Sequence, residues 1–530
     1  MASAPARRLA ASSAAVRPYR ARPVRRVAAG HAGTMAGWHP TRQPAGQQAM
    51  DRQTMLARVE DLVANDGHAA SIIETKALSI TGWGLAPQSR LRAAELGLTQ
   101  EQVRVIARQQ ERAFRLWCRE AHASGQIHFF DLQGLAVRDA LRCGEYLFLA
   151  RMLDVPGRRF SFALQDVHPE RLCSPPDSLG LSTLRDGIDV DPSTGAPLRY
   201  HIKNPSDGFD VDGWAAIDAR RGHRPLVMHG YRYTRAEQWR GEPALAPVVK
   251  LFKDKYDFLD YEVIAQILTA SIPIAIQTAG AGYAEGAASE KKRIYQRVSP
   301  GQFLYLNEGE SANPLQSNRP GNNFDGFFRL ILRTIGAAAG VPYEQVLKDF
   351  SQTNYSSARA ALLEFWRVCT EYRNWFIRAF CDQVWTMVQE EALLRGYWAI
   401  PGGDLDWFYR DMDLWTSVWW APPPRGYVDP LKEMQANELG LRIGVLSHSD
   451  VIGEQGRDAE EVFDQIARDR EDMDQRGLAF TLSGASPKPQ TPPVEEPAEG
   501  YSASTLAVLD KLDTLKLLCD KIGSRYGVAA

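Results

Sequence analysis

Apolar residues recur at helical spacing in several stretches of the chain, and the longest such stretch follows a short polar segment. Residues 349–357 are rich in Ser, Thr, Asn and Gln, whose side chains compete with helical backbone hydrogen bonds and favour turns and caps. From residue 358 to residue 395 there is neither Pro nor Gly, and Ala, Leu, Glu and Arg are common. The pattern predicts one long helix, capped by Ser356 or Ser357, with a polar loop held at its head.

The rest of the chain alternates helical patterns with short strand-like runs. We predict helices where apolar residues repeat every three or four positions, and strands where apolar runs end at Gly or Pro. The predicted helices cover residues 55–80, 101–124, 245–271 and 323–339, and the predicted strands cover residues 144–153, 160–164 and part of 405–420. This mixture predicts an α+β protein, and 530 residues are too many for a single core, so we expect two to four domains.

Residues 187–204 form two alternating runs around a Pro-Ser-Thr-Gly turn, which predicts a β-hairpin. The spacing of Asp189, Asp191 and Ser193 also invites comparison with a calcium-binding loop. In such a loop the Gly would come one place earlier than Gly195, and a bidentate Glu would stand where this chain has Tyr200. The hairpin is therefore favoured over a metal site.

No charged residue occurs between Glu262 and Glu285. This uncharged stretch is long enough to raise the question of a membrane-spanning helix. Pro273 interrupts this run, and Gln266 and Gln277 would be costly in hydrocarbon. Its Ala, Ser and Thr residues suit close helix packing. We predict contact with a neighbouring subunit and no membrane span.

Composition and charge narrow the function further. The chain is 44% hydrophobic and 24% charged, with a net charge of −2, which argues against a protein that grips nucleic acid through an excess of Lys and Arg. Its six cysteines form no CxxC pair and no metal-like spacing with His, so we expect reduced thiols, no metal and no cofactor.

The two ends of the chain differ in composition from the rest. Residues 1–50 contain eight Arg and no Asp or Glu, which predicts a flexible basic arm, although an organellar transit peptide has the same composition. Residues 481–500 are rich in Pro and acidic residues and predict a linker. Residues 501–530 carry a short heptad pattern that suits an amphipathic helix, which would pack on another subunit, on a partner or on the helices before it.

Several catalytic motifs are absent from the sequence. There is no Gly-Lys pair and hence no GxxxxGK[ST] phosphate loop, no HExxH and no GxSxG. These absences exclude the common ATP-hydrolysing, zinc-protease and serine-hydrolase classes.

The segment DFSQTNYSSARAALLE (residues 349–364), a few residues after GVPYE (340–344), closely resembles the lambda-type tailed-phage portal proteins. The resemblance extends over roughly residues 15–480, and it includes LVANDGHAASIIETKALSITGWGL (62–85). It also includes a signature of polar residues, to which we assign a structural role in a buried hydrogen-bonding corner: His229, Arg235, Gln238, Arg240 and Gly241.

Taken with the composition of the two ends, the resemblance implies a ring-forming portal fold with named parts. These are the arm (1–50), an α/β wing (51–244), a stem helix (245–272), a small α/β clip (273–322), a second stem helix (323–342), a tunnel loop (343–357), the long helix with the rest of the wing (358–425), a helical crown (426–480), the linker (481–500) and the C-terminal amphipathic helix (501–530).

The same resemblance implies a portal protein that is not an enzyme. It would form a dodecameric ring at one capsid vertex, through which double-stranded DNA is packaged and ejected with weak, sequence-independent contacts. The terminase large subunit would supply the motor, and the major capsid, head-completion and tail proteins would be further partners. The ring would assemble in the bacterial host cytoplasm and reside in the virion.

Two sets of site residues follow from that implication. The tunnel loop would face DNA through short polar groups, with Phe350 anchoring it in the channel wall, and the clip would dock an acidic partner. The channel residues are Asp349, Ser351, Gln352, Thr353, Asn354 and Tyr355, and the docking residues are Lys291, Lys292 and Arg293.

The sequence also leaves open an alternative function, that of an enzyme. Many Asp and Trp residues lie between positions 404 and 420, which suits a carboxylate-dependent, glycoside-type enzyme with an aromatic cleft.

Overall fold

The computed structural model describes residues 48–178, 183–205, 213–270, 274–278, 310–314, 324–351, 355–424, 430–457 and 459–477. The chain divides into two compact units, Met1–Ala459 and Glu460–Ala530. The features predicted for the basic arm, the Lys-Lys-Arg run, the linker and the C-terminal heptads lie outside the described residues. The α+β class is confirmed.

A three-stranded antiparallel sheet lies at the centre of the first unit. Its middle strand β2 (Glu145–Met152) pairs with β10 (Val227–Tyr231) on one side and with β3 (Phe162–Asp166) on the other. Because side chains alternate along a strand, Tyr146 and Phe148 enter the main aromatic core, whereas Leu147 and Leu149 face a second, smaller core. The sheet is therefore buried on both faces.

The smaller core is closed by a second sheet, in the order β4 (Leu184–Arg185), β5 (Ile188–Val190), β6 (Pro197–Lys203) and β7 (Trp214–Asp218). Strands β5 and β6 pair antiparallel, which confirms the predicted hairpin. At its turn the Asp191 carboxylate accepts hydrogen bonds from Ser193 and Thr194. The Asp191 carboxylate therefore stabilises the hairpin turn.

The opening helical pattern forms two helices, so the prediction of a single helix over residues 55–80 is wrong. Helix α1 (Gln48–Asn65) ends at Asp66, whose carboxylate caps α2 (Gly67–Thr81) by accepting from His68 N at 2.9 Å and Ala69 N at 3.1 Å. An Asp at such a break satisfies amide groups that a new helix leaves free.

Two further predictions needed their bounds corrected. Helix α4 (Gln100–Cys118) ends six residues before the predicted limit, and β3 begins two residues later than predicted. Helix α5 (Phe129–Arg142) was not predicted, and it packs directly against α2 and β2.

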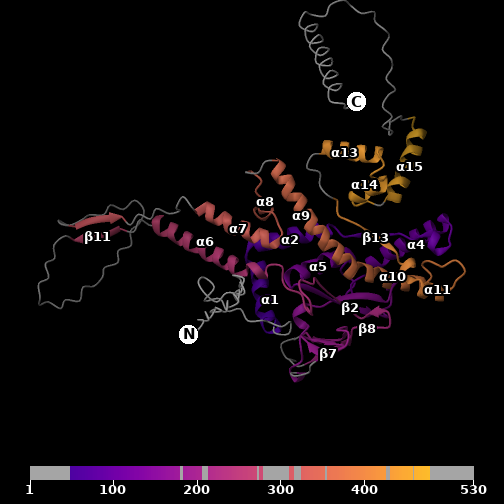
Figure 1. The fold of residues 1–530 in the computed structure, drawn as a ribbon, viewed down its shortest axis with the longest axis horizontal. Helices are drawn as coiled ribbons and strands as arrows, with labels where there is room; N and C mark the ends of the chain where they lie inside the picture. Colours follow the sequence, from indigo (N-terminus) through magenta and orange to yellow (C-terminus); the bar gives the residue numbers. More distant parts are fainter. Residues whose placement is uncertain are drawn as a thin grey trace, which may run out of the picture. The chain divides into compact units, whose positions relative to one another are not determined.

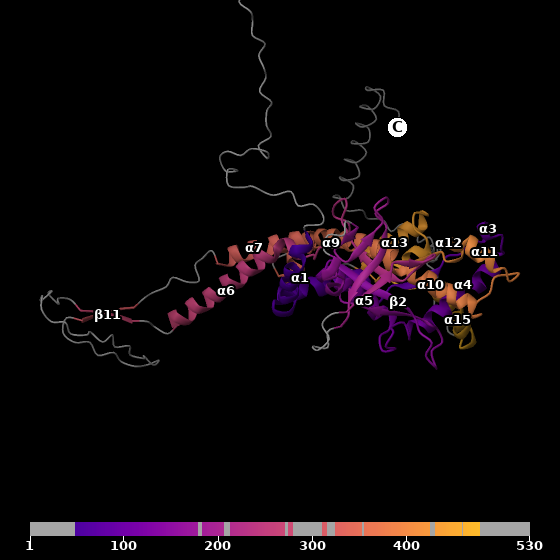
Figure 2. The same ribbon diagram turned by 90° about the horizontal axis from the view of Figure 1, so that it is seen from below.

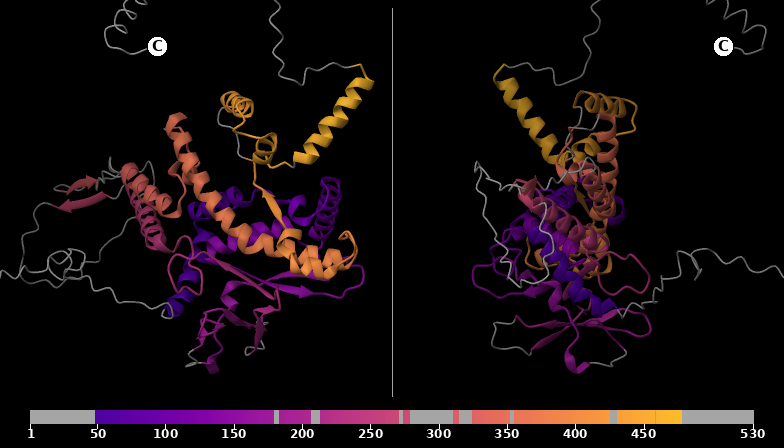
Figure 3. Two further views of the ribbon diagram at one scale, coloured as in Figure 1. Left: turned by 45° about the vertical axis from the view of Figure 1, so that its right-hand side comes forward. Right: turned by 90° about the vertical axis from the view of Figure 1, so that its left-hand side faces the viewer.

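The predicted long helix is present but is not uniform. It consists of α9 (Tyr355–Phe376), a π-helical turn (Ile377–Cys381) and α10 (Asp382–Leu394), and it passes over the central sheet (Figure 3). Since α9 already begins at Tyr355, Ser356 and Ser357 lie inside its first turn, and the prediction that one of them caps the helix is wrong. The π-helical turn lies where Phe380 meets Tyr146 and Phe148 of the sheet, with ring centroids 5.3 and 5.2 Å apart.

Two helices of the first unit run side by side: α6 (Val249–Ala270) and α7 (Phe324–Ala339) (Figure 1, Figure 2). Phe258 of α6 packs on Phe324 and Phe327 of α7, with centroid distances of 5.2 Å to each. Between the two helices in sequence, β11 (Ile274–Thr278) pairs with β12 (Glu310–Pro314). None of the described helices combines the length and apolarity that a bilayer crossing requires.

The strand predicted within residues 405–420 is present at the end of that range. Residues 405–415 form the short helices α11 (Leu405–Arg410) and α12 (Met412–Trp415), and only β13 (Val418–Ala421) is a strand, paired with β1 (Ala86–Ser89). The remaining elements are α3 (Ala93–Leu96), η4 (Pro169–Arg171), η5 (Pro176–Ser178), β8 (Arg220–Arg221), β9 (Arg224–Pro225), η6 (Ala246–Val248), α8 (Tyr343–Leu347), α13 (Pro430–Arg442), α14 (His448–Glu454) and α15 (Ala459–Gln475).

The polar corner predicted around the signature residues is centred on Glu145, the first residue of β2. Its carboxylate is fully buried and accepts from Arg240 Nε at 2.9 Å and from the Gly241 amide at 2.9 Å, and it lies 3.0 Å from His229 Nε2. Arg240 also donates to the carbonyl oxygens of Leu172, Asp186 and Pro169. One guanidinium therefore ties β2 to the segments that follow β3.

Close backbone contact accompanies this network. Gly144 has φ +86°, and a Cβ on Gly241 would lie 1.9 Å from the Gly144 carbonyl oxygen, so only glycine fits at both positions. Burial alone would raise the pKa of Glu145, but Arg240, His229 and Arg52 outweigh it and hold this pKa well below its usual value.

Not every signature residue joins the network. Gln238 does, because its amide donates to the Arg240 carbonyl and accepts from Thr234 N, both at 2.8 Å. Arg235 does not: its Nε and Nη2 are buried and have no hydrogen-bond partner within the described part of the chain.

We expect Glu145→Gln to destabilise the first unit strongly, because it removes the fully buried carboxylate charge from the network and leaves Arg240 and Arg52 with Asp186 as their shared counter-ion. The expected loss is about 3–5 kcal/mol, visible as a lower melting temperature by circular dichroism. Glu74→Gln is the matched control, since Glu74 pairs with Arg138 at the exposed surface and should cost about 0–1 kcal/mol. Equal melting temperatures for the two variants would contradict the role given to Glu145.

Candidate functional site: the segment between α8 and α9

The candidate segment is reached through a sharp turn after α7. Gly340, at φ +67°, ends the helix, and the amide of Val341 donates to the Gly336 carbonyl at 2.9 Å. Pro342 then precedes α8, where its fixed φ suits an extended residue before a helix start. The GVPYE motif is therefore a compact link between two helices.

Helix α8 ends in a left-handed residue that directs the chain into the loop. Lys348 has φ +58°, and its amide donates to the Glu344 carbonyl. The Asp349 amide donates to the same oxygen at 3.1 Å, while the Asp349 carboxylate accepts from Ser351 N at 2.9 Å. This bond to Ser351 lowers the pKa of Asp349, which is therefore an exposed, ionised group.

The structure places only some of the predicted channel residues. Asp349 and Ser351 are exposed, and Tyr355 is the first residue of α9. Gln352, Thr353 and Asn354 lie outside the described residues, as do the predicted docking residues Lys291, Lys292 and Arg293. Phe350 is 46% exposed in the single chain, so its expected role as an anchor in the channel wall stays a prediction.

Helix α2 holds the elements on both sides of this loop. Its Lys76 side chain is buried and donates to the carbonyl of Ala339, the last residue of α7, at 2.8 Å. The same ammonium group lies 4.5 Å from the ring centroid of Tyr372 on α9. One cation of α2 thus contacts α7, which precedes α8 and the loop, and α9, which follows the loop.

The ends of α2 are held in the same way. Arg373 of α9 donates to the carbonyl oxygens of Ser79 and Ile80, both at 2.7 Å. Close to the loop itself, Lys348 donates to the Thr75 hydroxyl at 2.6 Å. The two Arg373 bonds use carbonyl groups that a helix end leaves unsatisfied.

At its other end α2 is joined to α6. Lys255 is almost fully buried, and its ammonium pairs with the capping carboxylate Asp66 and lies 3.1 Å from His68 Nδ1. Burial and the Lys255 charge lower the pKa of His68. The α2 helix therefore connects α6, α7, α8 and α9 through charged groups.

Comparison with known proteins identifies the family to which a chain with this segment belongs. The model of the family "phage portal protein, lambda family" matches residues 31–373. This chain belongs to the lambda family of phage portal proteins. The matched region includes α2, α6, α7 and the whole α8–α9 loop.

Relatives in the portal family cover most of the chain. The portal protein of Escherichia phage N15 is 24% identical over 479 residues, which is 85% of this chain and 90% of that protein. Portal protein B of Escherichia phage lambda is 24% identical over 477 residues, 85% of this chain and 89% of that protein. Among solved structures, a chain from the neck of a native gene transfer agent particle computed with C12 symmetry has 14% identity and a TM-score of 0.40, covering 77% of this chain and 97% of that chain.

The Trp residues behind the rival enzyme hypothesis do not all lie at the surface. Trp415 and Trp420 are buried in the aromatic core, and Asp404 caps α11 through the amides of Asp406 and Trp407. A surface hollow here is lined by residues 409–414, which include no Trp. Trp415 and Trp420 therefore serve packing, whereas Trp419 is 37% exposed.

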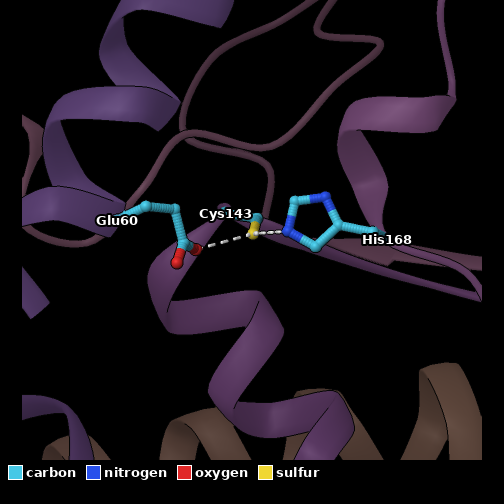
Figure 4. A group of neighbouring side chains, drawn as sticks. All are labelled: Glu60, Cys143 and His168. Carbon is cyan, nitrogen blue, oxygen red and sulfur yellow. Dashed lines mark hydrogen bonds between the residues drawn. The ribbon is translucent and has the colours of Figure 1, made fainter. Parts of the chain in front are cut away.

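One group of potential metal ligands was missed from the sequence. Glu60, Cys143 and His168 come from three separate segments, yet their side chains converge (Figure 4). Spacing along the chain gave no signal, because the three positions are distant in sequence. The five cysteines that the structure describes are all free thiols.

We expect Lys76→Met to loosen the junction of α2, α7 and α9. The change keeps the side-chain length but leaves the buried Ala339 carbonyl without its donor, a loss of about 1–3 kcal/mol. Hydrogen exchange of the α7 C-terminal amides should become faster. Lys250→Met is the control, because Lys250 is exposed and pairs with Asp254 one turn away. Unchanged exchange in the Lys76 variant would show that this bond does not hold the junction.

Proposed function

We propose that this chain assembles into a ring at one capsid vertex and lines the channel through which double-stranded DNA is packaged and ejected. The observation that carries the proposal is the α8–α9 loop. Its described residues are exposed, with the acidic Asp349 and the small polar Ser351 beside Lys348 and Phe350, and the loop is braced on both sides by α2. Family membership supports the ring, and twelve subunits is the number that the family resemblance implies.

The chemistry of the loop suits weak contact with a sliding duplex. Asp349 is ionised and repels phosphate, whereas Ser351 presents a short polar side chain. Lys or Arg at these positions would neutralise phosphates and hold the DNA in place. We propose that Gln352, Thr353, Asn354 and Tyr355 continue this surface.

The exposed apolar surface of α6 and α7 supports a subunit interface. Between 44% and 69% of each of these side chains is accessible in the single chain, and their exposure in water would be unfavourable. We propose that neighbouring copies cover them, since a closed ring needs two different faces on each subunit. The residues are Tyr256, Tyr261, Val263, Ile264, Ile267, Phe327 and Leu330.

Further parts of the proposal concern the partners and the named regions. The absence of a Gly-Lys pair supports a non-enzymatic protein whose motor is the terminase large subunit. We propose that Lys291, Lys292 and Arg293 in the clip region dock that partner, and that the wing, stem, clip and crown have the bounds given above. Capsid, head-completion and tail proteins would bind the ring, which would form in the host cytoplasm before it enters the virion.

Ring formation is tested by electron microscopy of the purified chain. We expect rings with a central hole in negative stain, and we expect Val263→Asp to give single chains, because it introduces a charge into the proposed interface. Val105→Asp is the control, since Val105 is 46% exposed on α4, away from that interface. A wild-type chain that remains monomeric at all concentrations would refute the ring.

Passage of DNA is tested separately with Ser351→Lys. Repeated around the ring, this change adds one phosphate-binding charge per subunit, and we expect DNA packaging or retention to fall by about tenfold or more while rings still form. Gln109→Lys adds the same charge at an exposed position of α4 and should package normally. Normal DNA-filled particles from Ser351→Lys would argue against the channel role of the loop without affecting the ring.

A further inference from the structure

Glu60, Cys143 and His168 bring three different ligand types to one point of the first unit (Figure 4). Glu60 lies on α1, Cys143 is the residue that ends α5, and His168 precedes the 3₁₀ helix η4. Cys143 Sγ is 3.6 Å from Glu60 Oε1 and 4.0 Å from His168 Nε2, and all three ligand atoms lie within 4.8 Å of one another.

These separations are close to those of a tetrahedral metal site. Metal–ligand bonds of about 2.0–2.3 Å at tetrahedral angles place neighbouring ligand atoms roughly 3.3–3.7 Å apart. The thiol-to-carboxylate distance already falls in this range. The imidazole must approach the thiol and the carboxylate, from which it is separated by 4.0 Å and by at most 4.8 Å. His168 is half exposed, so its ring has room to move.

We propose that Glu60, Cys143 and His168 bind a zinc ion, with water in the fourth position. A thiolate together with an imidazole selects zinc over magnesium or calcium, which prefer sites made of oxygen ligands alone. Binding breaks the S–H bond of Cys143, releases its proton to solvent and forms the sulfur–zinc bond.

The groups around the ligands suit this role. Arg142 pairs with the second oxygen of Glu60, Oε2, which leaves Oε1 directed at Cys143. His168 Nδ1 now accepts from the Glu170 amide at 3.3 Å, and the Glu170 carboxylate lies 4.0 Å away. When Nε2 binds zinc, the ring proton moves to Nδ1, which gives up the hydrogen bond from the Glu170 amide. The Nδ1–H then donates to the Glu170 carboxylate once the ring moves closer to it, as metal-bound histidines commonly do.

The site would act as a structural clamp beside the Glu145 network. Cys143 lies two residues before Glu145, and His168 precedes Pro169, whose carbonyl accepts from Arg240. The third ligand comes from α1, which also supplies Arg52 to the same network. Zinc would therefore fix α1 to the start of β2 and to the segment after β3.

The test uses the full chain, freed of metal by a chelator and then titrated with zinc chloride. We expect one zinc per chain and a higher melting temperature, and we expect His168→Ala to reduce the affinity at least about tenfold. Cobalt chloride in place of zinc should give the thiolate-to-metal charge-transfer band in the near ultraviolet, and Cys143→Ser should abolish this band.

Matched variants distinguish the site from other thiols and imidazoles. Cys173→Ser and His201→Ala should keep the zinc, the melting shift and the cobalt band. If Cys143→Ser fails to fold, His168→Ala alone still tests the site. His168 is half exposed, so its replacement should leave the fold intact. Zinc binding that is equal in wild type and His168→Ala, or a cobalt complex without the charge-transfer band, would overturn the proposal.

Discussion

Several helix ends meet in the interior of this protein. The structure depends on Lys and Arg side chains that donate hydrogen bonds to the carbonyl groups at these ends. A buried helix end leaves carbonyl groups that water cannot reach, and here Lys76 and Arg373 donate to three of them at 2.7–2.8 Å. Each of these bonds joins two different helices. Movement of α7 or α9 away from α2 would therefore expose an unsatisfied polar group, which is costly in the interior.

This constraint explains how an exposed loop can have a defined position. In the described part of the α8–α9 loop, residues 348–351, Lys348 donates to Thr75 and the Asp349 carboxylate accepts from Ser351. Its two flanking helices are also fixed to the same element, α2. In a portal ring, such bracing would let each copy present the same short polar groups to the channel while the surrounding fold resists displacement.

Local patterns in the sequence were sufficient for elements with strong periodicity and clear breakers. Helix α7, strand β2 and the β5–β6 hairpin lie where apolar spacing and the turn residues placed them. The break at Asp66 was missed because apolar spacing continues across it, whereas the capping bonds depend on a change of backbone direction. Helix α5 was missed in a similar way, since Gly134 lies within it and its stability comes from packing on α2 and β2.

Local sequence patterns could not predict contacts between residues that are distant in the sequence. The signature residues predicted a polar corner but not its centre, Glu145, which lies 95 positions from Arg240. The convergence of Cys143 with His168 was invisible for the same reason. For the loop, the resemblance of residues 349–364 supplied a function that periodicity alone did not contain.

The π-helical turn at Ile377–Cys381 separates two halves of one rod that have different surroundings. A π turn carries one extra residue, so the side chains after it are rotated by about 100° relative to an unbroken α-helix. Helix α9 can therefore keep one exposed side, whereas α10 buries nearly every residue from Val384 to Leu393. Loss of a single residue from that turn would realign the two halves and turn the wrong side of α10 toward the aromatic core.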